Sequence, residues 1–215
     1  MQLTSQQLFA MSPILPVIDM ENAECAIPVA ESLRAGGIGV LEIVLRSSDS
    51  LEAIKRIRRA LPDILVGAGT VTSVDNLNAA LDAGSQFIIT PGLTSSLAQV
   101  GQGLPVPFIP GVSNASDIML GLDHGLSAFK FFPAEASGGI ATLRALAAPF
   151  GEIEFCPTGG INEDNLVTYL SLRGVNCVGG SWLAPKAIQQ KQAFIEIENS
   201  ARRAMRLASR ALSGL

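Results

Sequence analysis

A lysine and a glutamate stand inside two apolar segments of the chain. Lys130 lies in "FKFFPAE" (129–135) and Glu42 in "LEIVLR" (41–46). Removing either charge from water is costly, so each residue needs a partner or a chemical use. A buried amine with a lowered pKa is a nucleophile that forms a Schiff base with a ketone, and a buried carboxylate suits acid–base catalysis. The two residues indicate amine chemistry, with a purely structural Lys130–Glu42 ion pair as the alternative.

Strand periodicity suggests where these side chains point. Side chains alternate in a strand, so Glu42 and Arg46 share one face, while the phenylalanines beside Lys130 occupy the face opposite to it. We expect the phenylalanines to pack on outer helices and Lys130 to point toward the same interior as Glu42. Arg46 could hold a substrate carboxylate by two parallel hydrogen bonds. An arginine exposed at the surface is the alternative.

Glycine pairs follow the last two apolar segments, in "PTGG" (157–160) and "GGS" (179–181). Backbone N–H groups at such turns can bind an anion, and the loops after strands 7 and 8 of a (β/α)8 barrel often hold a phosphate. Ordinary turn glycines are the alternative. The predicted phosphate-binding residues are Thr158, Gly159, Gly160, Gly179, Gly180 and Ser181. Thr70, at the end of "GAGT", can add a hydrogen-bond donor elsewhere in the site.

Apolar segments recur along the chain and alternate with segments typical of helices. The predicted strands are 14–19, 39–45, 64–70, 86–90, 107–112, 128–134, 154–160 and 177–182. This pattern predicts an α/β protein whose strands close into one (β/α)8 TIM barrel. Residues 1–215 would form a single barrel domain with a short N-terminal helix and a C-terminal helix. An open doubly wound sheet is the alternative, but no GxGxxG motif follows the first strand.

Capping residues and glycines mark the helices between these strands. The expected helical segments are 21–37, 48–63, 73–85, 113–127, 138–151 and 162–175. The segment 95–103 is too short for a helix to be predicted. Residues 191–212 form an amphipathic pattern, with its arginines on a solvated face.

Composition limits the other functional classes. The chain has 215 residues, 48% of them hydrophobic, and a net charge of −4. Nothing here favours a nucleic acid or an anionic membrane as a partner, and no signal peptide or membrane span is evident, so a cytoplasmic protein is expected. Cys25, Cys156 and Cys177 are expected to be buried, reduced thiols.

No metal site and no cofactor are predicted, because carboxylates do not cluster at the strand ends. The single histidine, His124, lies in a helix-end context. A Ser-His-Asp or Cys-His catalytic site is therefore not expected.

Together the motifs "LEIVLR", "GAGTV", "ITPGLT", "IPGVS", "FKFFPAE", "CPTGGI" and "GGSWL" resemble the 2-keto-3-deoxy-6-phosphogluconate (KDPG) aldolase and 4-hydroxy-2-oxoglutarate (KHG) aldolase family. The likeness extends from about residue 13 to residue 185. The resemblance implies a class I aldolase on a (β/α)8 barrel, usually trimeric. It would split KDPG into pyruvate and glyceraldehyde 3-phosphate in the Entner–Doudoroff pathway, and also KHG into pyruvate and glyoxylate.

The resemblance also assigns roles to individual residues. Lys130 would be the Schiff-base lysine and Glu42 the general acid–base. The residues expected at the pyruvate half are Arg46, Thr70, Pro91 and Phe132, and Gly159, Gly160 and Ser181 match phosphate-binding positions.

The sequence departs from the family at two places. Ser47-Ser48 replaces Thr-Glu or Thr-Pro, and Asp19-Met20 stands where some relatives carry a basic residue. Asp19 would weaken anion binding if it faced the pocket.

The alternatives are an aldolase for the galactonate-derived epimer and a phosphosugar isomerase or epimerase on the same barrel. A phosphate-binding barrel without catalysis and a purely structural protein are two further alternatives. The isomerase would use Glu42 for proton transfer and form no covalent adduct with pyruvate.

Overall fold

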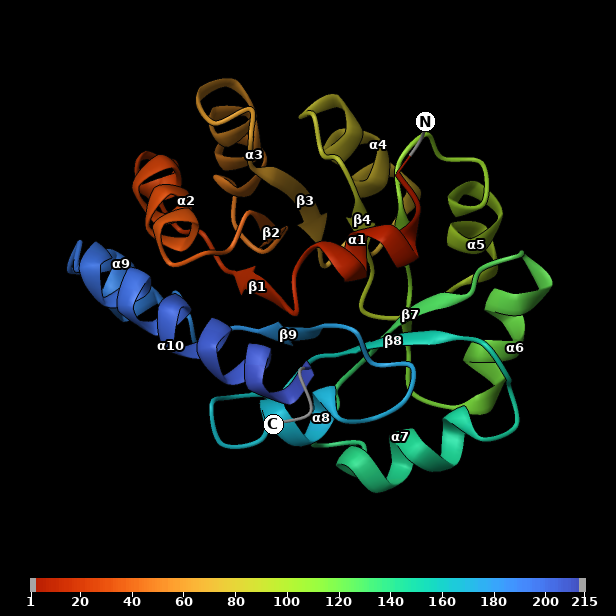
Figure 1. Ribbon diagram of the computed structural model, residues 1–215. Helices are drawn as coiled ribbons and strands as arrows, with labels where there is room; N and C mark the ends of the chain where they lie inside the picture. Colours follow the sequence, from red (N-terminus) through yellow and green to blue (C-terminus); the bar gives the residue numbers. More distant parts are fainter. Residues whose placement is uncertain (1–2, 213–215) are drawn as a thin grey trace.

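The computed structural model describes residues 3–212 and is an α/β fold in which strands and helices alternate (Figure 1). The strands are β1 (Ile14–Ile18), β2 (Val40–Val44), β3 (Leu65–Gly69), β4 (Ile88–Ile89), β5 (Phe108–Ile109), β6 (Gly111–Val112), β7 (Ala128–Phe131), β8 (Glu154–Pro157) and β9 (Val178–Gly180). The helices are α1 (Ser5–Met11), η1 (Ala23–Cys25), α2 (Ala26–Ala35), α3 (Ser50–Ala60), α4 (Val74–Asp82), α5 (Ser95–Gly101), α6 (Ala115–Asp123), α7 (Gly139–Ala147), α8 (Leu166–Leu170), α9 (Lys186–Gln190) and α10 (Phe194–Leu212).

The strands pair in parallel and form two sheets. A six-stranded sheet has the order β5-β4-β3-β2-β1-β9, and a three-stranded sheet has the order β6-β7-β8. Pro110 alone separates β5 from β6, because proline has no N–H to donate to the ladder. At the other edge, an isolated parallel bridge pairs Thr158 with Gly179 and so connects β8 with β9. The residues that were predicted to act together therefore lie on both sheets.

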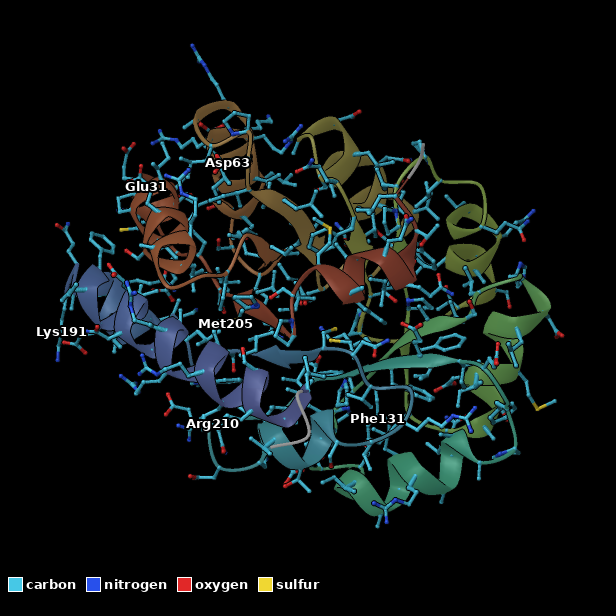
Figure 2. All side chains as sticks on the ribbon, viewed as in Figure 1. Glu31, Asp63, Phe131, Lys191, Met205 and Arg210 are labelled. Carbon is cyan, nitrogen blue, oxygen red and sulfur yellow. The ribbon has the colours of Figure 1, made fainter. Side chains whose placement is uncertain are left out.

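Buried apolar side chains form two clusters, one on each side of the strands. The larger cluster joins the strands to the outer helices and contains Ile14 and Ile18 of β1 as well as Phe129 and Phe131 of β7. Figure 2 shows Phe131 between the strands and the helices, whereas Glu31 and Lys191 lie at the periphery. The phenylalanines of β7 therefore pack outward, as predicted from strand periodicity.

The smaller cluster lies on the opposite face of the same strands. It consists of Leu8, Phe9, Leu15, Val40, Phe87, Ile89, Ile109, Ala128, Cys156 and Cys177. Its first two members come from α1, which crosses in front of the strands (Figure 1). Helix α1 begins with a capping box, in which the Thr4 hydroxyl accepts a hydrogen bond from the Gln7 N–H and the Gln7 side chain bonds back to Thr4. The N-terminal helix thus covers one end of the interior.

The predicted segments are confirmed at the level of element type, with shorter bounds. The last residues of the expected strands belong to loops, so the expected strand 154–160 is shortened to β8 and the expected strand 177–182 to β9. Residues 95–103, for which no helix was predicted, contain α5, whose N-cap Thr94 accepts a hydrogen bond from the Leu97 N–H. The short helix α9 was also not expected.

The C-terminal helix is amphipathic, as expected. Its buried residues are Ile197, Ser200, Ala201, Ala204 and Ala208. They face α2 and α8, and alanines at this spacing allow the helices to approach closely. Of the helices in residues 3–212, none is both long and apolar enough to cross a membrane. Residues 1–2 and 213–215 of the predicted domain lie outside the described part.

Candidate active site

Lys130 and Glu42 form an ion pair in the interior. The Nζ atom of Lys130 lies 3.0 Å from Oε1 of Glu42, although the residues are far apart in sequence. Lys130 is 5% exposed and Glu42 is fully buried. The ammonium also lies 5.3 Å from the centre of the Phe132 ring, within the range of a cation–π contact. The structure thus brings together the two residues that the sequence singled out.

Glycines make room for this pair. A Cβ atom on Gly69 of β3 would lie 1.8 Å from Oε1 of Glu42, far inside contact distance. A Cβ atom on Gly67 would meet the Phe87 ring at 2.3 Å. Only glycine at position 69 therefore allows the carboxylate to reach Lys130. The second oxygen of Glu42, Oε2, is buried and has no hydrogen-bond partner in the described part of the chain.

An unpaired acceptor beside a buried amine is unusual, because a buried polar group without a hydrogen bond costs about 1–3 kcal/mol. Such groups need an explanation, and a catalytic role is one of those available. The Oε2 atom of Glu42 can accept a proton or a hydrogen bond from a ligand.

Two candidate carboxylate-binding residues lie at the ends of neighbouring strands. Arg46 follows β2 and is exposed, and no hydrogen bond or ion pair of its guanidinium occurs among residues 3–212. Thr70 follows β3 and has a φ of 57°. A β-branched residue in the left-handed region is strained, and such strain clusters at functional sites. Both side chains remain available to a ligand.

Pro91 and Phe132 flank the same region. Pro91 is half-buried, and a Cβ on Gly111 would meet its carbonyl oxygen at 2.3 Å. Gly111 is the register partner of Lys130 on the neighbouring strand. The backbone at Pro91 thus lies close to the strand beside the lysine. Phe132 is half-buried.

The loop after β8 presents backbone N–H groups. Gly159 and Gly160 have φ angles of 101° and 82°, which favour glycine. The carbonyl of Gly159 accepts from the Glu135 N–H at 3.0 Å, and the carbonyl of Gly160 accepts from Nδ2 of Asn165 at 3.0 Å. In a trans peptide the next N–H points the opposite way, so those of Gly160 and Ile161 turn away from these partners. Neither donates a hydrogen bond within residues 3–212.

The end of β9 lies beside this loop. A Cβ on Gly179 would meet Oγ1 of Thr158 at 2.1 Å, so the two strands approach closely there. The Thr158 hydroxyl is engaged, because it donates to the Cys156 carbonyl at 3.3 Å. Ser181 is exposed and follows Gly180 at the strand end. The predicted phosphate-binding residues are therefore neighbours, and Ser181 has the hydroxyl that is open to solvent.

The two departures from the family sequence are accounted for locally. The Ser47 hydroxyl donates to the Met20 carbonyl, which ties the loop after β2 to the loop after β1. Oδ2 of Asp19 forms an ion pair with Lys186 at 3.0 Å, so its charge is compensated. Ser48 is exposed.

Sequence reasoning assigned no role to Glu135 and Tyr169, which meet beside the loop after β8. The Tyr169 hydroxyl donates to Oε1 of Glu135. Burial, and then this hydrogen bond to a carboxylate, raise the pKa of the Tyr169 phenol well above its ordinary value. A usable signal was present, since Tyr169 is the single tyrosine of the chain and lies on a short helix.

The remaining predictions concern histidine and cysteine. His124 is the C-cap of α6, as expected, with Nδ1 3.2 Å from Oε1 of Gln102. All three cysteines are free. Cys156 and Cys177 are buried, but Cys25 is half-buried, because it lies at the surface-facing end of a 3-10 helix. The prediction of burial was wrong for Cys25.

Known proteins resemble this chain along almost its whole length. A family model described as KDPG and KHG aldolase matches residues 6–200. The 2-dehydro-3-deoxy-phosphogluconate aldolase of Dickeya dadantii is 47% identical over 202 residues, which cover 94% of this chain and 95% of that protein. The KHG/KDPG aldolase of Escherichia coli is 44% identical over the same coverage of both chains.

Solved structures agree with these relatives. The KDPG aldolase of Legionella pneumophila, with pyruvate captured as a covalent carbinolamine intermediate, has a TM-score of 0.91 and 43% identity. The match covers 93% of this chain and 97% of that one. A KDPG aldolase of Zymomonas mobilis with 3-phosphoglycerate has a TM-score of 0.88 and 42% identity, covering 93% and 94%.

Proposed function

The chain belongs to the KDPG and KHG aldolase family, and we propose that it is a class I aldolase with Lys130 as its Schiff-base residue. Its main reaction would cleave KDPG to pyruvate and glyceraldehyde 3-phosphate. A second reaction would cleave KHG to pyruvate and glyoxylate. The observation that carries the proposal is the buried amine of Lys130, 3.0 Å from the buried carboxylate of Glu42.

The pair supports the first chemical step. Glu42 takes a proton from the Lys130 ammonium, and the resulting neutral amine attacks the C2 ketone of the substrate. The carbinolamine then loses its hydroxyl as water, with Glu42 returning the proton. A protonated imine remains on Lys130, and Glu42 is again a carboxylate.

The imine then accepts the electrons of the bond that breaks. Glu42, directly or through a water molecule, takes the proton of the C4 hydroxyl as the C3–C4 bond breaks and an aldehyde leaves. The electron pair moves to the imine nitrogen and gives a neutral enamine. Protonation at C3 and hydrolysis release pyruvate and restore Lys130.

At the pyruvate half, we assign the substrate carboxylate to Arg46 and Thr70. Support comes from the exposed guanidinium at the end of β2 and from the left-handed backbone of Thr70 at the end of β3. Pro91 and Phe132 would form the apolar wall of this half. Holding the carboxylate keeps the reacting carbons aligned with the amine.

At the other half, we assign the phosphate to the loops after β8 and β9. The N–H groups of Gly160 and Ile161 support this, because they are turned away from their neighbours and are free of partners in the described residues. Successive N–H groups in such a turn form an anion-binding concavity. The other residues assigned to this half are Thr158, Gly159, Gly179, Gly180 and Ser181.

We further propose that the strands close into a (β/α)8 barrel within a single domain that assembles as a cytoplasmic homotrimer. The bridge between Thr158 and Gly179 and the short break at Pro110 support closure at both sheet edges. The 47% identity to a KDPG aldolase supports the gluconate substrate over its epimer, because a native KDPGal structure is only 25% identical. Light scattering of the purified protein would measure the trimer.

Incubation with pyruvate and borohydride tests the proposed function. Borohydride reduces an imine to a stable amine, and peptide mass spectrometry then locates the adduct. A pyruvyl adduct on Lys130 is the expected result. Folded protein without any adduct would refute the Schiff-base mechanism and favour an isomerase or a binding protein.

A further inference from the structure

The segment after β7 lies directly against the loop that we assign to the phosphate. Ala134 N–H donates to the Thr158 carbonyl at 2.8 Å, and Glu135 N–H donates to the Gly159 carbonyl at 3.0 Å. The Glu135 side chain covers the next residue, since its Cγ lies 2.6 Å from where a Cβ on Gly160 would stand. An acidic side chain is thus placed beside backbone groups that are suited to an anion.

Tyr169 fixes the position of this side chain. It is fully buried on α8, and its hydroxyl donates to Oε1 of Glu135. A hydrogen bond to an ionised carboxylate is stronger than one between neutral groups, so the carboxylate is held at the tyrosine. The backbone N–H of Glu135 and the side chain of Asn165 hold the loop itself.

Without the Tyr169 hydroxyl, the Glu135 carboxylate would have another hydrogen-bond donor nearby, the N–H of Gly160. The N–H of Gly160 has no partner in residues 3–212, and the Glu135 carboxylate is one bond beyond the Cγ that packs on this glycine. A carboxylate accepts readily from such N–H groups. A freed carboxylate would occupy the loop and also repel an incoming phosphate, since like charges disfavour each other.

We propose that Tyr169 is a positioning residue for phosphate recognition, which holds the Glu135 carboxylate away from the loop after β8. The inference rests on the proposed function only in taking this loop as the phosphate site. It concerns affinity for phosphorylated ligands and leaves the chemistry at Lys130 unchanged. Tyr169 and Glu135 would together determine how strongly KDPG is preferred over the unphosphorylated KHG.

The test compares four proteins: the native chain, Tyr169→Phe, Glu135→Gln and the double variant. Kinetics with KDPG and KHG are measured for each, together with inhibition by inorganic phosphate. We expect Tyr169→Phe to raise KM for KDPG and Ki for phosphate about tenfold, as for the loss of one hydrogen bond to a charged group. Its kinetics with KHG should stay within about twofold of the native values.

The double variant separates charge from shape. Adding Glu135→Gln to Tyr169→Phe should return KM for KDPG to near the native value, because no carboxylate remains to occupy the loop. Thr168→Val serves as the matched control, since it removes an exposed hydroxyl from the same helix. Thermal melting of each variant checks that the fold is retained.

Three results would overturn the inference: an equal effect on KDPG and KHG, no effect of Tyr169→Phe, or no rescue in the double variant. If Tyr169→Phe does not fold, Glu135→Gln alone decides. A KM for KDPG at or below the native value then supports the inference, and a tenfold rise overturns it. A native protein that cleaves neither substrate would instead refute the proposed function, and phosphate affinity would still be measurable by calorimetry.

Discussion

The reacting end and the phosphate end of the candidate site are built from different parts of the chain. At the reacting end, side chains on strands of two different sheets carry the charges, and Lys130 meets Glu42 at 3.0 Å. At the proposed phosphate end, backbone groups of glycine-rich loops would do the binding, and the Glu135 side chain beside them accepts a hydrogen bond from the Tyr169 hydroxyl. One end depends on side-chain identity, and the other depends on backbone shape.

This difference predicts how each end responds to mutation. Removing a reacting side chain abolishes a chemical step, whereas distorting a loop weakens binding and leaves the chemistry in place. Glycine matters at both ends for different reasons. Gly69 leaves space for Glu42, while Gly160 adopts a left-handed backbone conformation.

The largest effect is expected for Lys130→Ala. Without the amine no imine forms, and kcat for KDPG should fall by about 10⁴-fold or more. Lys191→Ala, which alters an exposed lysine, is the control and should retain native activity. Circular dichroism establishes that both variants fold. Near-native turnover of Lys130→Ala would show that the reaction does not need this amine, and it would refute the assignment of the chemistry to the reacting end.

Gly69→Ala should have the next largest effect. Its Cβ would lie 1.8 Å from Oε1 of Glu42, so the carboxylate must move from Lys130. A displacement of about 1 Å costs on the order of 10²-fold in rate, and kcat should fall for KDPG and KHG alike. Gly39→Ala is the matched control, because nothing lies within 4 Å of its added Cβ. Loss of KDPG binding with unchanged kcat would contradict the separation of the two ends.

Gly160→Ala should act on binding. The added Cβ would meet the Glu135 side chain at 2.6 Å, at a φ of 82°. The left-handed conformation alone costs about 1–2 kcal/mol of folding stability. Displacement of the loop N–H groups should raise KM for KDPG about tenfold, as for the loss of one hydrogen bond to a charged group. Gly125→Ala has a similar φ of 72° and no neighbour within 4 Å, so it controls for backbone strain. Borohydride trapping of pyruvate on Lys130 should continue, and its loss would show that the ends are not independent.

The smallest effect concerns the alkaline titration of Tyr169. Because burial and Glu135 raise its pKa, the single tyrosine should ionise in the folded protein well above pH 10. The linked stability is fully present below the unfolded pKa of about 10 and is lost as pH rises further. Ultraviolet absorbance of the phenolate measures the pH at which Tyr169 ionises, and Glu135→Gln should lower that pH. A phenolate transition at about pH 10 in the native protein would contradict both the burial of the Tyr169 phenol and its hydrogen bond to Glu135.

Much of the fold and of the reacting end could be predicted from the sequence. Lys130 and Glu42 stand out because charged residues in apolar strands are costly without a use. Strand periodicity predicted that both side chains point toward the same interior. The phenylalanines of β7 pack outward as that periodicity requires. The types of the elements could also be predicted, apart from the helices α5 and α9, whose few residues give a weak periodic pattern.

The remainder depends on contacts between distant parts of the chain. No local pattern shows that Gly69 makes room for Glu42, that Asp19 pairs with Lys186 or that Tyr169 holds Glu135. Element type and the facing of side chains follow from local periodicity, so the α/β pattern and the residues able to do the chemistry could be inferred from the order of the amino acids. The distance between Lys130 and Glu42 and the direction of the loop N–H groups depend on how distant strands and loops pack together, and no local pattern encodes that packing.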